Sequence, residues 1–152
     1  MHVIIATDGS KQSLAAARQL KSFADPSKIN DISVVAVISP LAVVPFVDEL
    51  SDPGSKQGGD PTELSFRAEA QAATSVVMAE FEDWGATTVH RHVLSGSPAA
   101  EIVKLASQLE AGLIVVASGS GGLSDRILLG STASRVQHSA PCPVLVSRPM
   151  HK

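Results

Sequence analysis

Three short segments of the sequence carry residue types that can bind phosphate or sugar groups. Residues 7–10 (Thr-Asp-Gly-Ser) follow an apolar run, residues 118–122 are a glycine-rich turn, and residues 130–132 (Gly-Ser-Thr) open a helical pattern. The Asp8 carboxylate can accept hydrogen bonds from vicinal sugar hydroxyls. Glycines let backbone amides approach phosphate oxygens, and the unpaired amides of a helix start, joined by the Ser131 hydroxyl, form a second anion site.

Each segment also has a purely structural interpretation. Asp8 can be a helix N-cap, the glycines of residues 118–122 can serve a turn alone, and Gly130-Ser131 can simply start a helix. Ligand binding is favoured because all three segments are predicted at the same edge of one sheet. In open parallel sheets, ligands bind at the carboxyl ends of the strands, where the strand order reverses.

Strand-like and helix-like segments alternate along the chain, which is typical of a parallel sheet with crossover helices. Apolar runs predict strands at residues 3–6, 32–38, 86–94, 113–117 and 144–147. Helical spacing predicts helices at residues 10–24, 60–84, 97–109 and 131–139. We therefore expect a single α/β domain over residues 1–152, with five strands in one open parallel sheet and four helices.

Composition limits the class of protein. The chain has 152 residues, of which 44% are hydrophobic and 18% charged, as expected of one folded domain. A net charge of −3, no basic run, four Phe, one Trp and no Tyr argue against nucleic-acid binding. No apolar run approaches the ~18 residues of a membrane span, and no basic signal-like region precedes residue 8. The single cysteine, Cys142, cannot form an intrachain disulfide, which is typical of proteins in a reducing compartment. We therefore expect a cytoplasmic protein.

Residues 45–60 (PFVDELSDPGSKQGGD) mix Pro, Gly, Ser, Lys and Asp without periodicity. This composition predicts a loop within the domain and not a linker between two domains. The segment follows the second strand, so it leaves the sheet on the side of the predicted ligand site. It is interpreted as a lid or a partner-docking loop over that site.

The sequence supports a catalytic or a metal-binding function less well than it supports ligand binding. Neither a P-loop nor a dinucleotide fingerprint occurs, so a binding module is favoured over an enzyme, and any ATP hydrolysis should be slow. A serine hydrolase would use Ser120, Asp125 and His138, but this Asp follows the serine too closely to come from a later strand. His90 and His92 project from one side of a strand and can chelate a metal. Because no third ligand is evident, no metal centre is expected.

The chain resembles the universal stress protein family over essentially its whole length. The resemblance rests on the first apolar strand, which ends in Asp8-Gly9-Ser10, and on residues 96–146. Members that bind ATP carry G-x2-G-x9-G-[S/T] after the fourth strand, and here residues 119–122 and 130–131 match the two ends of that pattern. Seven residues, two fewer than in the pattern, separate Gly122 from Gly130. The shorter loop leaves two alternatives, a nucleotide smaller than ATP or no nucleotide at all.

The resemblance implies a sheet in the order 3-2-1-4-5, helices on both faces and an adenine nucleotide alpha hydrolase-like fold. It implies a stress-response or signalling module that binds ATP or another adenine nucleotide, with or without Mg²⁺. The implied binding residues are Thr7, Asp8, Val37, Ile38, Gly119, Gly122, Arg126, Gly130, Ser131 and Thr132. Arg126 can equally be a solvated loop charge.

The resemblance further implies a homodimer that pairs through the last strand, here Val144 to Val146, whose apolar edge would otherwise be exposed. The alternative function is a dimeric stress protein that binds no nucleotide and acts through partner proteins.

Overall fold

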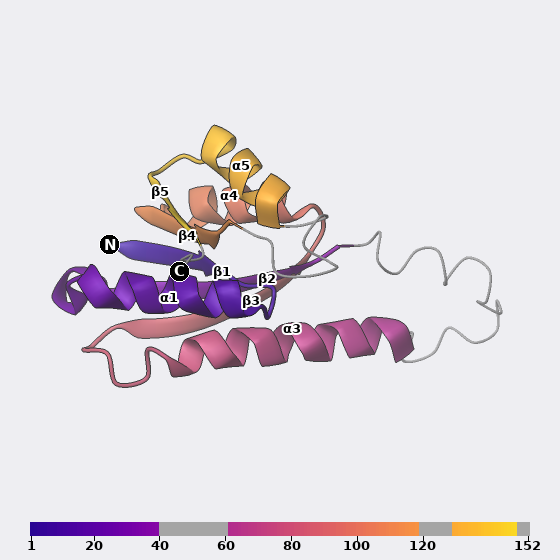
Figure 1. Cartoon of the computed structure of the whole chain (residues 1–152), viewed down its shortest axis with the longest axis horizontal. Helices are drawn as coiled ribbons and strands as arrows, with labels where there is room; N and C mark the ends of the chain where they lie inside the picture. The colour runs from indigo at the N-terminus through magenta and orange to yellow at the C-terminus, as the bar shows by residue number, and fades with distance from the viewer. Residues whose placement is uncertain (40–60, 119–128, 149–152) are drawn as a thin grey trace.

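The computed structural model describes residues 1–39, 61–118 and 129–148, in which the strands form one parallel sheet (Figure 1). Its order, β3-β2-β1-β4-β5, is the predicted one. The strands are β1 (His2–Ala6), β2 (Asp31–Ile38), β3 (Thr88–Ser95), β4 (Leu113–Ala117) and β5 (Val144–Ser147). The helices are α1 (Lys11–Phe23), α3 (Pro61–Ala79), α4 (Pro98–Leu109) and α5 (Leu129–Ser139), with a 3₁₀ turn, η1 (Pro26–Lys28), after α1.

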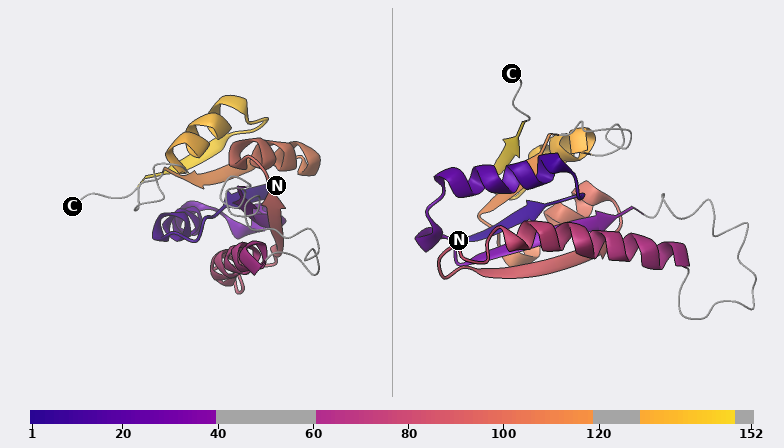
Figure 2. Two further views of the ribbon diagram at one scale, coloured as in Figure 1. Left: turned by 90° about the vertical axis from the view of Figure 1, so that its right-hand side faces the viewer. Right: turned by 60° about the horizontal axis from the view of Figure 1, so that its bottom comes forward.

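The helices lie on both faces of the sheet, α1 and α3 on one and α4 and α5 on the other (Figure 2). The central strand β1 alternates between the two cores. Val3 and Ile5 pack with α1 and α3, whereas Ile4 and Ala6 pack with α4 and α5. A strand that is covered on both faces needs a continuous apolar run, which explains the sequence pattern of β1.

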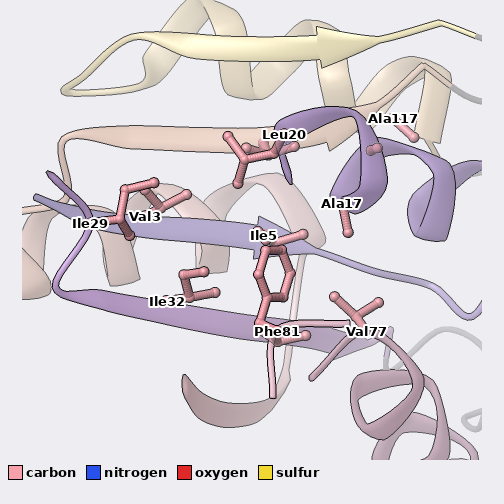
Figure 3. Close-up of a cluster of buried hydrophobic side chains, with 12 residues drawn as sticks. Val3, Ile5, Ala17, Leu20, Ile29, Ile32, Val77, Phe81 and Ala117 are labelled. Atoms are coloured by element: carbon pink, nitrogen blue, oxygen red, sulfur yellow. The ribbon is translucent and has the colours of Figure 1, made fainter. Parts of the chain in front are cut away.

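Figure 3 shows the core on the α1 and α3 side of the sheet. Leu20 of α1 and Val77 of α3 are each 1% exposed and belong to the same cluster as Ile5 and Ile32. Fully burying a side chain of this size contributes about 1.5–3 kcal/mol. The cluster therefore fixes α1 and α3 against the sheet, and these helices carry the residues that flank the end of β1.

The end of α3 differs from the prediction. The apolar stripe predicts a helix through Trp84, but α3 ends at Ala79 and tighter turns follow. In these turns the amides of Glu80 and Phe81 bond to carbonyls three residues earlier, at 3.0 Å each. The turns place Phe81 in the core, 1% exposed, with its ring edge-on to Trp84 at 5.3 Å between centroids. Packing of Phe81 in the core therefore ends α3 at Ala79, although the apolar stripe in the sequence continues to Trp84.

The end of α4 also differs in detail. Gly112 follows the predicted helix end, but the left-handed residue that terminates α4 is Glu110, with φ of 52°. Gly112 has a different role, because a Cβ there would lie 2.7 Å from Met1 Cγ, and its amide donates to His2 O at 2.8 Å. A larger residue at this position would therefore displace the exposed side chain of Met1.

The predicted lid at residues 45–60 lies outside the described residues. A search of the described helices finds none with both the length and the apolarity needed to cross a membrane.

Replacing Phe81 with alanine tests the α3 side of the core. Because Phe81 is 1% exposed, Phe81→Ala is expected to lower the free energy of unfolding by about 3–5 kcal/mol, measured by urea denaturation. Phe23→Ala is the matched control, because Phe23 is 62% exposed and its loss should change stability by only about 0.5 kcal/mol. Equal losses in the two variants would contradict the described core.

Candidate functional site

The turn from β1 into α1 is held in place by the buried hydroxyl of Thr7. Thr7 is 5% exposed, and its amide donates to Val35 O on β2 at 2.9 Å. Its Oγ1 is 2.8 Å from Ser13 Oγ and accepts a hydrogen bond from the Gly9 amide at 3.1 Å. These bonds give Thr7 a positioning role, since its hydroxyl is engaged inside the turn.

Asp8 is exposed at the carboxyl end of β1. Its Oδ1 accepts a hydrogen bond from the Ser10 amide at 2.9 Å, which is a local side-chain turn. Ser10, and not Asp8, is the N-cap of α1, because its side chain accepts from the Ser13 amide at 3.1 Å. The N-cap interpretation of Asp8 is therefore wrong, and the carboxylate is held by one oxygen at the rim of the turn.

An open pocket of about 420 Å³ lies between this turn and α3. Its size is within the range of pockets that hold small molecules. The residues from the turn and α1 are Thr7, Asp8, Gly9, Ser10, Lys11, Ser13 and Leu14. Those from α3 are Glu69, Ala72, Ala73, Val76 and Val77. The pocket thus has a polar wall around Asp8 and a largely apolar wall opposite it.

The α3 wall comes very close to the turn. Gly9 has φ of +83°, and a Cβ added there would lie 3.4 Å from the Ala73 Cβ. Val76 is 53% exposed, so this large apolar side chain remains accessible at the pocket. Sequence reasoning missed this wall because it considered only the core stripe of α3. The spacing of Glu69, Ala72, Ala73 and Val76 (i, i+3, i+4, i+7) places them on one helix face and could have indicated it.

Val37 and Ile38 lie at the carboxyl end of β2, at the same sheet edge as Thr7 and Asp8. Both are half-buried, and Val37 packs against the core under α4 and α5. The Ile38 carbonyl accepts a hydrogen bond from the Gly96 amide at 3.0 Å. The structure therefore brings Val37 and Ile38 to the predicted edge, but neither lines the pocket beside Asp8.

Gly130 and Ser131 lie in the first turn of α5, which begins at Leu129. This agrees with the helix start predicted at these residues. Thr132 follows them and is 7% exposed. A buried Thr132 side chain is better suited to packing than to ligand contact. The remaining predicted binding residues, Gly119, Gly122 and Arg126, lie outside the described residues, as do Ser120 and Asp125 of the hydrolase interpretation.

A larger groove of about 920 Å³ runs between α4 and α5 and contains none of the predicted binding residues. It is lined by side chains such as Lys104, Arg135 and His138. We regard the smaller pocket as the candidate site, because it includes Asp8 and lies at the carboxyl end of the central strand, where ligands bind in this type of sheet.

The comparisons with known proteins agree with this fold. The model of the universal stress protein family matches residues 1–148. The chain belongs to this family. A universal stress protein of Methanocaldococcus jannaschii is 40% identical over 152 residues, covering 95% of this chain and 79% of the relative. The hypothetical protein MJ0577 superposes with a TM-score of 0.74 at 25% identity, covering 99% of this chain and 97% of that protein.

Two further solved structures of the family contain adenine nucleotides. A universal stress protein in complex with cAMP has a TM-score of 0.57 and 22% identity, covering 97% of this chain and 95% of that one. An Arabidopsis thaliana family member with AMP bound has a TM-score of 0.64 and 14% identity, covering 99% and 92%. These likenesses show that the two proteins share the fold of this chain.

The two histidines of β3 have different hydrogen-bond partners. His90 Nε2 lies 2.9 Å from Asp31 Oδ1, whereas His92 Nε2 lies 3.0 Å from Ser33 Oγ. The same hydroxyl is 2.7 Å from His2 Nε2. Across residues 1–39, 61–118 and 129–148, no group of three or more His, Cys, Asp or Glu is arranged to hold a metal ion.

Burial lowers the pKa of both His2 and His92 below the ordinary value of 6.5. Repulsion from neighbouring imidazoles lowers the pKa of His92 further. For His2, the attraction of Asp31 acts in the opposite direction but does not outweigh burial. Burial likewise raises the pKa of the Cys142 thiol, which packs against the α4 and α5 core, so Cys142 is suited to packing and not to redox chemistry.

The lowered histidine pKa values predict how stability depends on pH. The unfolded chain binds protons at His2 and His92 more readily than the folded chain does, so stability should fall as pH drops below about 6.5. Urea denaturation at pH 7.5 and 5.5, with a metal chelator present, measures this loss. His92→Gln should reduce the loss, whereas His138→Gln, on an exposed helix position, should leave it unchanged. If His92→Gln lost as much stability between pH 7.5 and 5.5 as the unsubstituted protein, His92 would not be a source of the pH dependence.

Proposed function

We propose that this protein binds an adenine nucleotide, with the nucleoside in the pocket beside Asp8 and the phosphates toward the start of α5. The observation that carries the proposal is the exposed Asp8 carboxylate opposite an apolar wall, at the carboxyl end of the central strand. Family membership and the AMP and cAMP complexes of two relatives support the ligand class. The shorter segment between Gly122 and Gly130 favours a ligand smaller than ATP.

The nucleoside end matches the chemistry of the pocket. Oδ1 of Asp8 holds the Ser10 amide, and its second carboxylate oxygen can accept a hydrogen bond from a ribose hydroxyl. Ala72, Ala73 and Val76 provide an apolar surface for a planar base. A few polar groups that fix orientation beside a larger apolar wall are typical of cofactor sites.

The phosphate end needs different surroundings. Two carboxylates, Asp8 and Glu69, line the pocket with Lys11, so a polyphosphate in the same place would meet like charge. The first turn of α5 offers unpaired amides and the positive end of the helix dipole. We infer that Gly130 and Ser131 hold phosphate there, together with Gly119, Gly122 and Arg126 of the preceding glycine-rich segment, and with Mg²⁺ where the ligand is ATP.

The biological role that we propose is a cytoplasmic stress-response or signalling module and not a fast enzyme. We further propose a homodimer formed through β5, which is an edge strand of the sheet and carries three half-buried apolar residues, Val144 to Val146. An apolar sheet edge favours pairing with a second copy. The second candidate function, a dimer that acts through partners without a nucleotide, is favoured by the shorter glycine-rich segment.

Nucleotide binding to an Asp8 variant tests the proposal. Protein is first unfolded to release any carried nucleotide, which is identified by chromatography, and the refolded protein is titrated calorimetrically with AMP, cAMP and ATP. Asp8→Asn should weaken binding of the best ligand by roughly 10- to 100-fold, the cost of losing a charged hydrogen bond.

Asp25→Asn is the matched control. Asp25 is exposed and, like Asp8, accepts a hydrogen bond from the amide two residues on, at 3.0 Å, but it lies beside η1 and away from the pocket. It should bind nucleotide like the unsubstituted protein. Equal loss in both variants would argue against a direct contact of Asp8, and the absence of both carried and added nucleotide would decide for the second candidate function.

A further inference from the structure

Two histidine side chains meet at one buried hydroxyl, that of Ser33 on β2, which is in register with Ile4 of β1. His2 Nε2 lies 2.7 Å and His92 Nε2 lies 3.0 Å from Ser33 Oγ, and Ser33 is fully buried. Because both nitrogens are within 3.0 Å of the same oxygen, they are no more than about 6 Å apart.

The parallel sheet creates this meeting point. His2 is on β1 and His92 on β3, with β2 between them, and the register places His2 beside Asp31 and His92 beside Val35. Ser33 lies midway between Asp31 and Val35 and on the same face of β2, because side chains alternate along a strand. Its short side chain leaves the space above β2 into which two imidazoles from the flanking strands extend. The two histidines are separated by more than half of the chain.

We propose that this His2–His92 pair is a binding site for a divalent transition metal ion such as Zn²⁺. Neutral imidazole nitrogens are ligands that Zn²⁺, Ni²⁺ and Cu²⁺ share. Metal–nitrogen distances of about 2.0–2.1 Å place two ligating nitrogens roughly 3–4 Å apart, so the two rings move closer together when the ion binds.

The site is a two-histidine chelate, because the described residues contain no group of three metal-binding side chains. Water completes the coordination. His90 is excluded from it, although it is a close neighbour with its ring centroid 6.0 Å from that of His2. The His90 Nε2 atom is paired with Asp31 Oδ1 at 2.9 Å, and this pairing directs it away from Ser33.

Zinc titration of the full chain, without an added histidine tag, tests the proposal. Zn²⁺ is titrated at pH 7.5 in competition with a chromophoric chelator, and the melting temperature is measured with and without Zn²⁺. His2→Gln and His92→Gln keep a hydrogen-bonding group beside Ser33 but remove a zinc ligand. Each should raise the zinc dissociation constant by roughly 100-fold, since two linked ligands bind far more tightly than one. Each should also abolish the zinc-dependent rise in melting temperature.

His90→Gln is the matched control, because it removes an exposed histidine of the same strand. It should bind Zn²⁺ within about twofold of the unsubstituted chain, and circular dichroism should show that all three variants are folded. Equal weakening in His90→Gln, or unchanged binding in either His2→Gln or His92→Gln, would overturn the proposal. So would stoichiometric binding that appears only at millimolar zinc. Nucleotide titration of the same variants is expected to be unaffected, so the two proposals fail separately.

Discussion

Burial of β1 on both faces is the constraint on which the rest of the structure depends. Val3, Ile4 and Ile5 are 0% exposed, so no polar ligand group can be accommodated along the length of this strand. Polar chemistry is possible only at its ends. At the carboxyl end, the buried Thr7 hydroxyl ties the chain to Ser13 and sets the turn that presents Asp8. The stability of the core and the position of the candidate carboxylate therefore have the same origin.

The two halves of the proposed nucleotide site differ in charge for a physical reason. A base and a ribose favour an apolar surface and hydrogen-bond acceptors, whereas phosphates favour amides and positive potential. The first set of groups comes from the β1 to α1 turn and from α3, and the second from the start of α5. The sheet separates these requirements by placing helices from opposite layers at one edge. In the proposed site, this arrangement lets a protein of net charge −3 accept an anionic ligand.

The buried hydroxyl of Ser33 on β2 imposes a separate constraint on the sheet. Ser33 is buried and polar in the middle of a hydrophobic sheet, and a buried hydroxyl without a partner would be costly. Its two imidazole partners satisfy it, and no buried side-chain polar atom in the described residues lacks a hydrogen bond. The same requirement that keeps Ser33 bonded brings His2 and His92 together. A metal-binding pair is thus a consequence of satisfying one polar group.

The order and type of most elements could be predicted from the sequence, because continuous apolar runs and helical spacing are local signals. The strands at residues 113–117 and 144–147 were predicted with the bounds that the structure has, and Asp8 was predicted at the correct edge. Only the tertiary structure decided where α3 ends, since packing of Phe81 overrides the apolar stripe. It also decided that α3 forms the wall of the pocket and that His2 and His92 both contact the Ser33 hydroxyl. Periodicity along the sequence shows which residues share one face of a helix or strand. Strand register and helix docking decide which segments far apart in the chain come into contact.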